Sequence, residues 1–210
     1  MANSFLLTDP ATRSDLEKFL NRAKRLDSNG AVRLKAFGEV LTATVAPIYN
    51  SSILGNDPTI LGMRVAKLSE PSDGDVVASL GSILERLAGK DLTLSWPPSR
   101  EVVPWAGISP PQSGWEHLGE ISAIEISEIA KAGIEEVAAS VPQDTGASLV
   151  QKVRSNVWGR SFGEFGLPQG VCFGLLGLGF LENGQEVKVY ANQNWRRLSS
   201  SFGHVLTKLS

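Results

Sequence analysis

The first half of the chain combines a helical pattern of apolar residues with strand-like alternation. Apolar side chains recur at helical spacing from Leu16 to Leu26, after a start signal at Asp9-Pro10 that offers a capping carboxylate and a first-turn proline. The segments that follow alternate apolar and polar positions or run almost without charge, as strands do. The pattern predicts strands at residues 31–36, 39–47 and 59–68 with a turn at Phe37-Gly38, a helix at residues 76–87 and a short strand at residues 92–94.

The second half has helical spacing in its middle and alternation at its end. The pattern predicts a short strand at residues 115–121, helices at residues 122–140, 144–158 and 169–181, and strands at residues 186–191, 195–199 and 204–209. The third helix is apolar on every side, so it is either buried all round or part of an interface. We expect burial within the chain, because sequential elements usually pack together.

These elements predict an α+β fold in two lobes. The N-terminal lobe, residues 1–95, has the order helix, antiparallel meander, helix, and the C-terminal lobe, residues 116–210, has three helices followed by a three-stranded antiparallel meander. Residues 96–115 hold three of the five Trp and five of the eleven Pro. So many prolines exclude a helix or a central strand, and the Trp side chains favour burial. We therefore expect a stiff connector packed on the body, and two lobes that share one core.

Composition excludes several classes of protein. The chain of 210 residues has a net charge of −2, so no global field attracts a polyanion. Its single cysteine, Cys172, excludes an intramolecular disulfide and the usual multi-cysteine zinc sites. The N-terminus lacks the basic and apolar regions of a signal peptide, and the longest apolar run, residues 171–181, is too short to span a bilayer. These features predict a cytoplasmic protein that has no contact with a membrane.

Few side chains are suited to catalysis. The two histidines are His117 and His204, and Cys172 lies in the most apolar segment, where cysteine acts as a small hydrophobic residue. The glycine-rich loop at residues 159–166 could approach a phosphate, with Arg160 supplying charge, but it lacks the spacing of known phosphate-binding loops. Packing of this loop by Phe162 and Phe165 is favoured instead. We predict no catalytic residue, no cofactor and no metal.

The last strands concentrate basic and aromatic side chains. Trp195, Arg196 and Arg197 lie there together with Lys208. Three helices followed by a twisted hairpin are also the order of a winged-helix unit, in which such side chains contact nucleic acid. The third helix, however, presents Val, Phe, Leu and Gly in place of the polar groups that contact bases. Nucleic-acid binding is therefore not favoured.

Four segments resemble one known family when taken together. They are Ser4-Phe-Leu-Leu-Thr-Asp-Pro-Ala-Thr12, Pro104-Trp-Ala-Gly-Ile-Ser-Pro-Pro111, Trp158-Gly-Arg160 and Gly203-His-Val-Leu206. The chain resembles, over essentially its whole length, an uncharacterised family of actinobacterial cytoplasmic proteins. The resemblance implies a cytoplasmic setting and carries no activity, so no catalytic residue follows from it.

Three hypotheses of function follow from the sequence. The first is a non-enzymatic interaction protein that binds a protein partner or forms a dimer. The second is a nucleic-acid-associated regulator that acts through the C-terminal basic hairpin, and the third is a small enzyme with a site between the two lobes. Aromatic and Arg side chains are enriched in protein interfaces. The candidate partner-binding residues are therefore Trp105, Trp115, Arg160, Trp195, Arg196 and Arg197.

Overall fold

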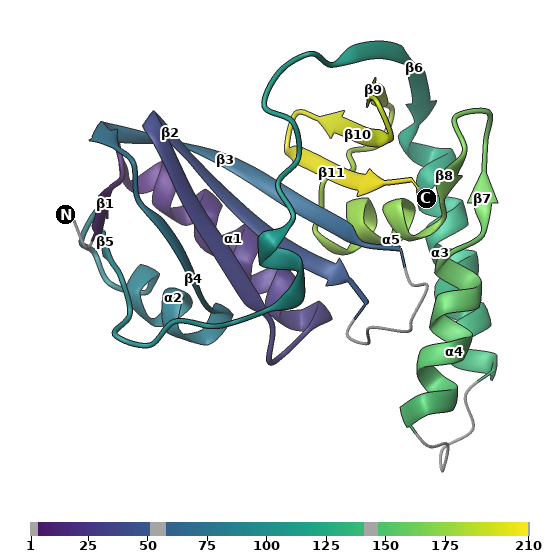
Figure 1. Ribbon diagram of the computed structural model, residues 1–210, viewed down its shortest axis with the longest axis horizontal. Helices are drawn as coiled ribbons and strands as arrows, with labels where there is room; N and C mark the ends of the chain where they lie inside the picture. Colours follow the sequence, from purple (N-terminus) through teal and green to yellow (C-terminus); the bar gives the residue numbers. More distant parts are fainter. Residues whose placement is uncertain (1–3, 51–57, 141–146, 210) are drawn as a thin grey trace. The chain divides into compact units, whose positions relative to one another are not determined.

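The computed structural model describes residues 4–50, 58–140 and 147–209 (Figure 1). Its helices and strands confirm the α+β class that the sequence predicts. The chain forms two compact units, and their boundary does not follow a single cut in the sequence. The first unit comprises Met1–Pro47 and Gly62–Ile108, and the second comprises Ile48–Leu61 and Ser109–Ser210. Among the described residues, no helix is long and apolar enough to cross a lipid bilayer.

The first unit contains three neighbouring sheet strands, in the order β4-β2-β3, and a separate antiparallel pair, β1 and β5. Strand β2 pairs with β4 in antiparallel register, from Ala31 opposite Ser79 to Lys35 opposite Asp75. The last residue of β2 and the first two residues of β3 belong to the second unit. The elements are β1 (Ser4–Leu6), α1 (Pro10–Leu26), β2 (Ala31–Ile48), β3 (Ile60–Ser72), β4 (Asp75–Ser79), α2 (Leu80–Leu87), β5 (Thr93–Ser95) and the short 3-10 helix η1 (Pro104–Gly107).

Helix α1 begins where the sequence predicts. The Asp9 carboxylate accepts a hydrogen bond from the backbone N–H of Thr12 at 2.7 Å, and Pro10 occupies the first turn. An N-terminal cap of this kind satisfies a backbone donor that has no partner inside the helix. The apolar stripe is buried at Leu16, Phe19, Leu20 and Ala23. The helical spacing of apolar residues was therefore sufficient to place this element.

Two local predictions in this unit are wrong. The structure has one continuous strand, β2, where the sequence predicts two strands and a turn at Phe37-Gly38. Gly38 has a φ of +57°, and no atom lies within 4 Å of the position that a Cβ would take. The glycine therefore takes a left-handed conformation inside the strand without reversing the chain. The second helix is also shorter than predicted, because Val76 and Val77 form β4 and Ser79 caps α2 by accepting from the Ser82 N–H at 3.2 Å.

The second unit contains a run of four neighbouring antiparallel strands in the order β11-β10-β9-β6. A short hairpin, β7 and β8, replaces the predicted glycine-rich loop, and Phe165 at its tip packs against Gly119 of β6. The predicted cap of the second helix, Asp144, lies outside the described residues. The elements are β6 (Glu116–Ser122), α3 (Ala123–Ser140), α4 (Ala147–Trp158), β7 (Ser161–Phe162), β8 (Leu167–Pro168), α5 (Gly170–Gly177), β9 (Glu186–Asn192), β10 (Trp195–Ser200) and β11 (Gly203–Lys208).

Helix α5 is the centre of the second unit. It contacts α3, α4 and β11, and Val171, Cys172 and Leu175 have no solvent exposure. A Cβ on Gly174 would come within 3.1 Å of Ile60 Cγ2, so the helix lies close to the start of β3. The helix ends four residues before the predicted position. Gly179, with a φ of +70°, donates to the Leu176 carbonyl, and the next N–H donates to the Leu175 carbonyl, which is the hydrogen-bond pattern of a glycine C-terminal cap.

Candidate functional site

The sheet of the second unit has one apolar face and one polar, aromatic face. Val187, Val189, Leu198 and Val205 alternate with the polar positions and are buried with at most 1% exposure. The positions between them point to the opposite face, because successive side chains of a strand alternate in direction. That face holds Lys188, Tyr190, Arg197, Ser199 and His204 from β9, β10 and β11, together with the buried Trp195 and Leu206.

The strand register gathers three side chains from neighbouring strands, and one side chain from the connector joins them. His117 of β6 lies opposite Tyr190 of β9, which lies opposite Arg197 of β10. Trp115, the last tryptophan of the predicted connector, reaches the same Arg197. We call Trp115, His117, Tyr190 and Arg197 the cation–aromatic cluster.

Arg197 contacts two aromatic rings. Its guanidinium carbon lies 4.7 Å from the centre of the Trp115 ring and 4.5 Å from the centre of the Tyr190 ring. The Tyr190 ring in turn meets His117 edge to face, with 5.3 Å between ring centres. Each of the two cation–π contacts stabilises the cation by roughly 0.5–1 kcal/mol when exposed and more when desolvated. The two rings together restrict where this guanidinium can point.

Arg197 is half-buried and lacks a counterion among the described residues. Its Nε atom is buried without a hydrogen-bond partner, whereas the two terminal nitrogens are not among the buried unpartnered atoms. The four ion pairs of the described chain involve other residues. Burial lowers the pKa of Arg197 from its usual value, and the partial charge of Tyr190 opposes this change. The side chain stays protonated, because arginine does not lose its proton in proteins.

The end of the connector fixes Trp115 in place. The indole Nε1–H donates to the Pro111 carbonyl at 3.0 Å, and the Asn192 side-chain amide donates to the Ser113 carbonyl at 2.8 Å. The proline-rich turn at residues 110–115 is thus closed on itself and tied to the end of β9. The ring is half-buried, so one part of its surface remains in contact with solvent.

A second row of polar side chains crosses the same face. Glu120 of β6 lies opposite Lys188 of β9, and Ser199 of β10 lies opposite both Lys188 and His204 of β11. The Ser199 hydroxyl and His204 Nδ1 are 2.9 Å apart and share a hydrogen bond. An irregularity between His117 and Gly119 lets β6 contribute both His117 and Glu120 to this face. The face therefore carries acidic, basic and aromatic groups together.

The structure brings together two of the six residues that the sequence singles out, Trp115 and Arg197. Trp195 is 7% exposed and is counted with the core. The Arg196 guanidinium donates to the carbonyls of Gln193 and Trp195, so it stabilises the β9–β10 turn. Arg160 forms two 2.6 Å hydrogen bonds with Glu136 of α3, and this pairing lowers the pKa of the glutamate.

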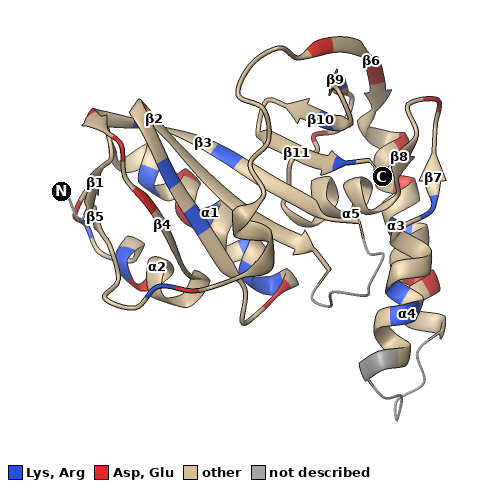
Figure 2. Cartoon of the chain, in the orientation of Figure 1, with Lys and Arg blue, Asp and Glu red and all other residues tan. Residues whose placement is uncertain are grey.

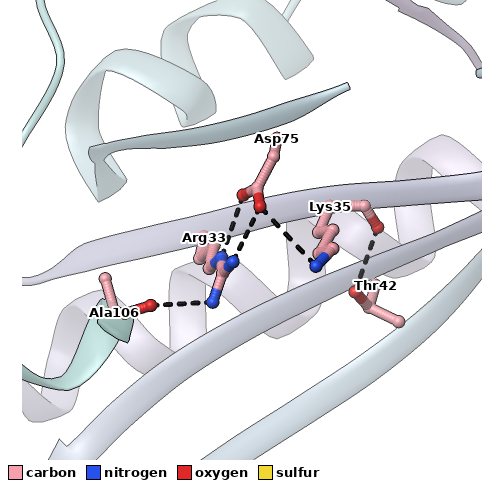
Figure 3. A network of polar contacts seen from close by, with 5 residues as sticks. All are labelled: Arg33, Lys35, Thr42, Asp75 and Ala106. Carbon is pink, nitrogen blue, oxygen red and sulfur yellow. Dashed lines mark hydrogen bonds and ion pairs between the residues drawn. The ribbon is translucent and has the colours of Figure 1, made fainter. Parts of the chain in front are cut away.

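Trp105 lies in the first unit and is 3% exposed. Arg33 fixes the backbone beside it by donating to the Ala106 carbonyl at 2.7 Å (Figure 3). The same guanidinium donates to both oxygens of Asp75, at 2.9 and 2.7 Å, and Lys35 lies 3.8 Å from that carboxylate. The hydroxyl of Thr42 donates to the Lys35 carbonyl at 3.0 Å. Because its ring is buried, Trp105 is not part of the surface that we consider for a partner.

Sequence reasoning missed two members of the cation–aromatic cluster, Tyr190 and His117. The alternation of apolar and polar residues placed Tyr190 in a strand and on one side of its sheet. It did not predict that β6 is the neighbour of this strand, because β6 lies about seventy residues earlier in the chain. Alternation within β9 and β10 would have put Tyr190 opposite Arg197 once the turn at residues 193–194 was counted.

Neither the thiol of Cys172 nor a metal-binding cluster provides a catalytic group in the described structure. Burial raises the pKa of the Cys172 thiol to about 12, so the thiolate that acts as a nucleophile is not formed near neutral pH. In the ranges that the structure covers, no three His, Cys, Asp or Glu side chains gather in a way that could hold a metal ion. Figure 2 shows Lys and Arg interspersed with Asp and Glu on the elements of each unit.

Solved structures resemble this chain at low sequence identity. The putative DNA polymerase III beta subunit from Eubacterium rectale has a TM-score of 0.50 at 11% identity, over 94% of this chain and 63% of its own. The DNA polymerase III subunit beta from Pseudomonas aeruginosa has a TM-score of 0.48 at 15% identity, over 94% of this chain and 63% of its own. The Helicobacter pylori beta clamp has a TM-score of 0.48 at 12% identity, over 99% and 66%.

The chain spans less than two thirds of the length of these proteins. At 11% identity, the likeness to the Eubacterium rectale protein shows a sliding-clamp-like fold and nothing of the activity.

Two family models divide the chain between them. Residues 110–210 match the domain of unknown function DUF8185, and residues 1–107 match the domain of unknown function DUF8010. No curated protein matches the chain. Because the DUF8010 model covers just over half of the 210 residues, the chain belongs to the DUF8010 family, and its later residues match the DUF8185 model.

Proposed function

We propose that this protein is a non-enzymatic interaction protein that binds a segment of a protein partner through the cation–aromatic cluster. The observation that supports this most is the half-buried Arg197 in contact with the Trp115 and Tyr190 rings. Trp, Tyr and Arg are the residue types that contribute most to binding energy at protein interfaces. They are also rigid here, so little conformational entropy is lost when a partner binds.

The fold likeness supports assembly only in a general way. The Eubacterium rectale protein is named as a putative subunit of a polymerase. Carried to this chain, that name suggests a part in an assembly of proteins, and it does not say which partner is bound. The surface chemistry of the second unit is therefore the basis of the proposal.

Selection of displayed random peptides against the full chain tests the proposed function. We expect the recovered peptides to bind the wild type, and we expect Trp115→Ala to weaken binding at least tenfold, since truncation of an interface aromatic residue commonly costs 1–2 kcal/mol or more. Phe37→Ala is the matched control, because Phe37 is a 75% exposed aromatic residue of the first unit. Light scattering of the wild type measures self-association in parallel. Recovery of no peptide, together with a monomer at all concentrations, would contradict the proposal.

Nucleic-acid binding is a second candidate, and one observation favours it. Arg197 and Lys188 lie on neighbouring strands of the polar face, next to two aromatic rings, and single-stranded nucleic acid binds surfaces of this chemistry. Against it, residues 110–210 hold eight Lys and Arg and ten Asp and Glu. We expect a labelled single-stranded or duplex oligonucleotide to bind weakly at physiological salt. Sub-micromolar binding that Arg196→Ala plus Arg197→Ala abolishes would promote this candidate.

A further inference from the structure

We infer that Arg197 is the receptor for a carboxylate of the partner segment, supplied by an Asp or Glu side chain. This inference rests on the proposed function and adds the chemical class of the group that is bound. A guanidinium presents paired N–H donors that match the two oxygens of a carboxylate.

Arg197 lacks a counterion within the described chain. Lys188, the cation of β9, lies opposite Glu120 of β6. The cross-strand neighbours of Arg197 are Tyr190 and Leu206, neither of which carries a carboxylate. Within the part of the chain that the structure describes, Arg197 forms no ion pair. A half-buried cation without an opposite charge gains more from an incoming anion than an exposed lysine does.

The Arg197 guanidinium is restricted in its orientation. It contacts the rings of Trp115 and Tyr190 at 4.7 and 4.5 Å from their centres, and Trp115 is itself fixed by its hydrogen bond to Pro111. The buried Nε faces the protein, so the accessible donors are the terminal nitrogens. Because the side chain is already restricted, binding costs less conformational entropy than for a free arginine.

The charges on the polar face favour a single carboxylate over a chain of phosphates. The edge strand β6 carries exposed Glu120 on this face, and the adjacent β9 begins with exposed Glu186 on the same face. A polyanionic backbone that crossed this face would meet these like charges, whereas one carboxylate that approaches Arg197 would not. The observations therefore favour an acidic peptide over a nucleic acid.

A double-mutant cycle between peptide and protein tests the inference. Peptides recovered by the display selection are synthesised in matched pairs, with each Asp or Glu replaced by Asn or Gln. We expect one such replacement to weaken binding to the wild type roughly tenfold to hundredfold, the range for a hydrogen bond to a charged group. We expect the same replacement to have no effect on Arg197→Gln, and Arg197→Lys to retain part of the affinity as a charge without the paired donors.

Lys152→Gln is the matched control, because it removes an equal charge from the exposed surface of α4. It should leave both the affinity and the effect of the peptide replacement unchanged. Thermal unfolding of each variant shows whether Arg197→Gln keeps the fold.

Wild-type protein alone can overturn the inference. Recovered peptides that bind equally well without any carboxylate would refute the carboxylate receptor and leave the proposed function intact. An equal loss in the wild type and in Arg197→Gln would place the carboxylate at another residue. Tight binding of a labelled oligo-dT strand that is lost in Arg197→Gln would show that the anion is a nucleic-acid phosphate. Recovery of no peptide at all, together with a monomer at all concentrations, would contradict the proposed function as well.

Discussion

At the scale of single residues, Gly133 shows how closely α3 packs in the second unit. A Cβ at this position would lie 2.5 Å from the Trp158 ring, which is 2% exposed and also meets Phe173 with 4.8 Å between ring centres. The ring has little room to move, because protein interiors are close-packed. The position therefore requires a glycine for packing, although glycine is an unfavourable residue inside a helix.

We predict that Gly133→Ala lowers the free energy of unfolding by about 1–2 kcal/mol. Overpacking of a core typically costs about 1–3 kcal/mol, and the higher helix propensity of alanine recovers up to about 1 kcal/mol. Denaturant unfolding measures the change. Gly81→Ala in α2 is the control, since its Cβ would meet only the end of the Lys24 side chain at 3.5 Å. That variant should be neutral or more stable by about 0.5 kcal/mol, and equal effects at both positions would contradict the packing argument.

The pair of Arg33 and Asp75 makes a pH-dependent contribution at the residue scale. The hydrogen bonds from Arg33 hold the pKa of Asp75 below its usual value, and partial burial opposes this shift. A carboxyl with a lowered pKa in the folded state stabilises the protein above its unfolded-state pKa. That contribution is lost as the pH falls through the folded-state pKa.

We predict that Asp75→Asn is less stable than the wild type at pH 7 by at most about 1 kcal/mol, because the pair is partly exposed. The difference should disappear between about pH 5 and pH 2, where the wild-type carboxylate becomes protonated. Urea unfolding of both proteins across this range measures it. Asp73→Asn, at an exposed position two residues away, should change the stability at pH 7 by less than about 0.5 kcal/mol. A difference for Asp75→Asn that persists at pH 2 would contradict the assignment to this carboxylate.

At the scale of elements, the sequence placed those segments in which local signals agree. Helix α1 has a cap, a first-turn proline and an apolar stripe, and its prediction is confirmed. Strand β2 was divided at Gly38, because a glycine after an exposed aromatic residue has the local appearance of a turn. Helix α5 was extended too far, because its apolar composition continues beyond the Gly179 cap and hydrophobicity alone does not mark a helix end.

The connector supplies a prediction at the same scale. Trp105→Ala should destabilise the protein by about 3–5 kcal/mol, since its ring is 3% exposed and truncation of a buried aromatic residue leaves a cavity. Thermal or denaturant unfolding measures the loss. Val102→Ala is the matched control in the same segment, because Val102 is 98% exposed and should be close to neutral. A loss below about 1 kcal/mol for Trp105→Ala would show that the connector does not contribute to the core.

At the scale of the whole molecule, we predict a single cooperative unfolding transition. Strands β2 and β3 each contribute residues to both compact units. We therefore expect that unfolding of these strands in one unit also destabilises the other unit. Calorimetry of Trp105→Ala, in the first unit, and Gly133→Ala, in the second, should show one transition that both changes move. Two separate transitions, each moved by one change alone, would refute the shared core.

The candidate surface could be predicted only in part, because residue type is visible in the sequence and the pairing of distant strands is not. Residue type alone drew attention to Trp115 and Arg197. It also drew attention to three residues with structural roles: Trp105 and Trp195 are buried, and Arg196 stabilises a turn. The difference between these groups depends on which strand lies next to which. Tyr190 is opposite Arg197 through a local hairpin, whereas His117 is opposite Tyr190 through a pairing between distant segments. The periodicity of the sequence predicts the local pairing of Tyr190 with Arg197, but it does not predict the pairing of His117 with Tyr190.

The interleaved course of the chain has a consequence for how such genes can recombine. The two family regions meet between residues 107 and 110, yet the second unit also uses Ile48, Ile60 and Leu61 from within the first region. A ribosome releases these three apolar residues about fifty to sixty residues before the first residues of the segment 109–210 that packs with them. An exchange of one family region between related genes would therefore join a new second region to the old Ile48, Ile60 and Leu61, so the exchanged region must fit these three side chains.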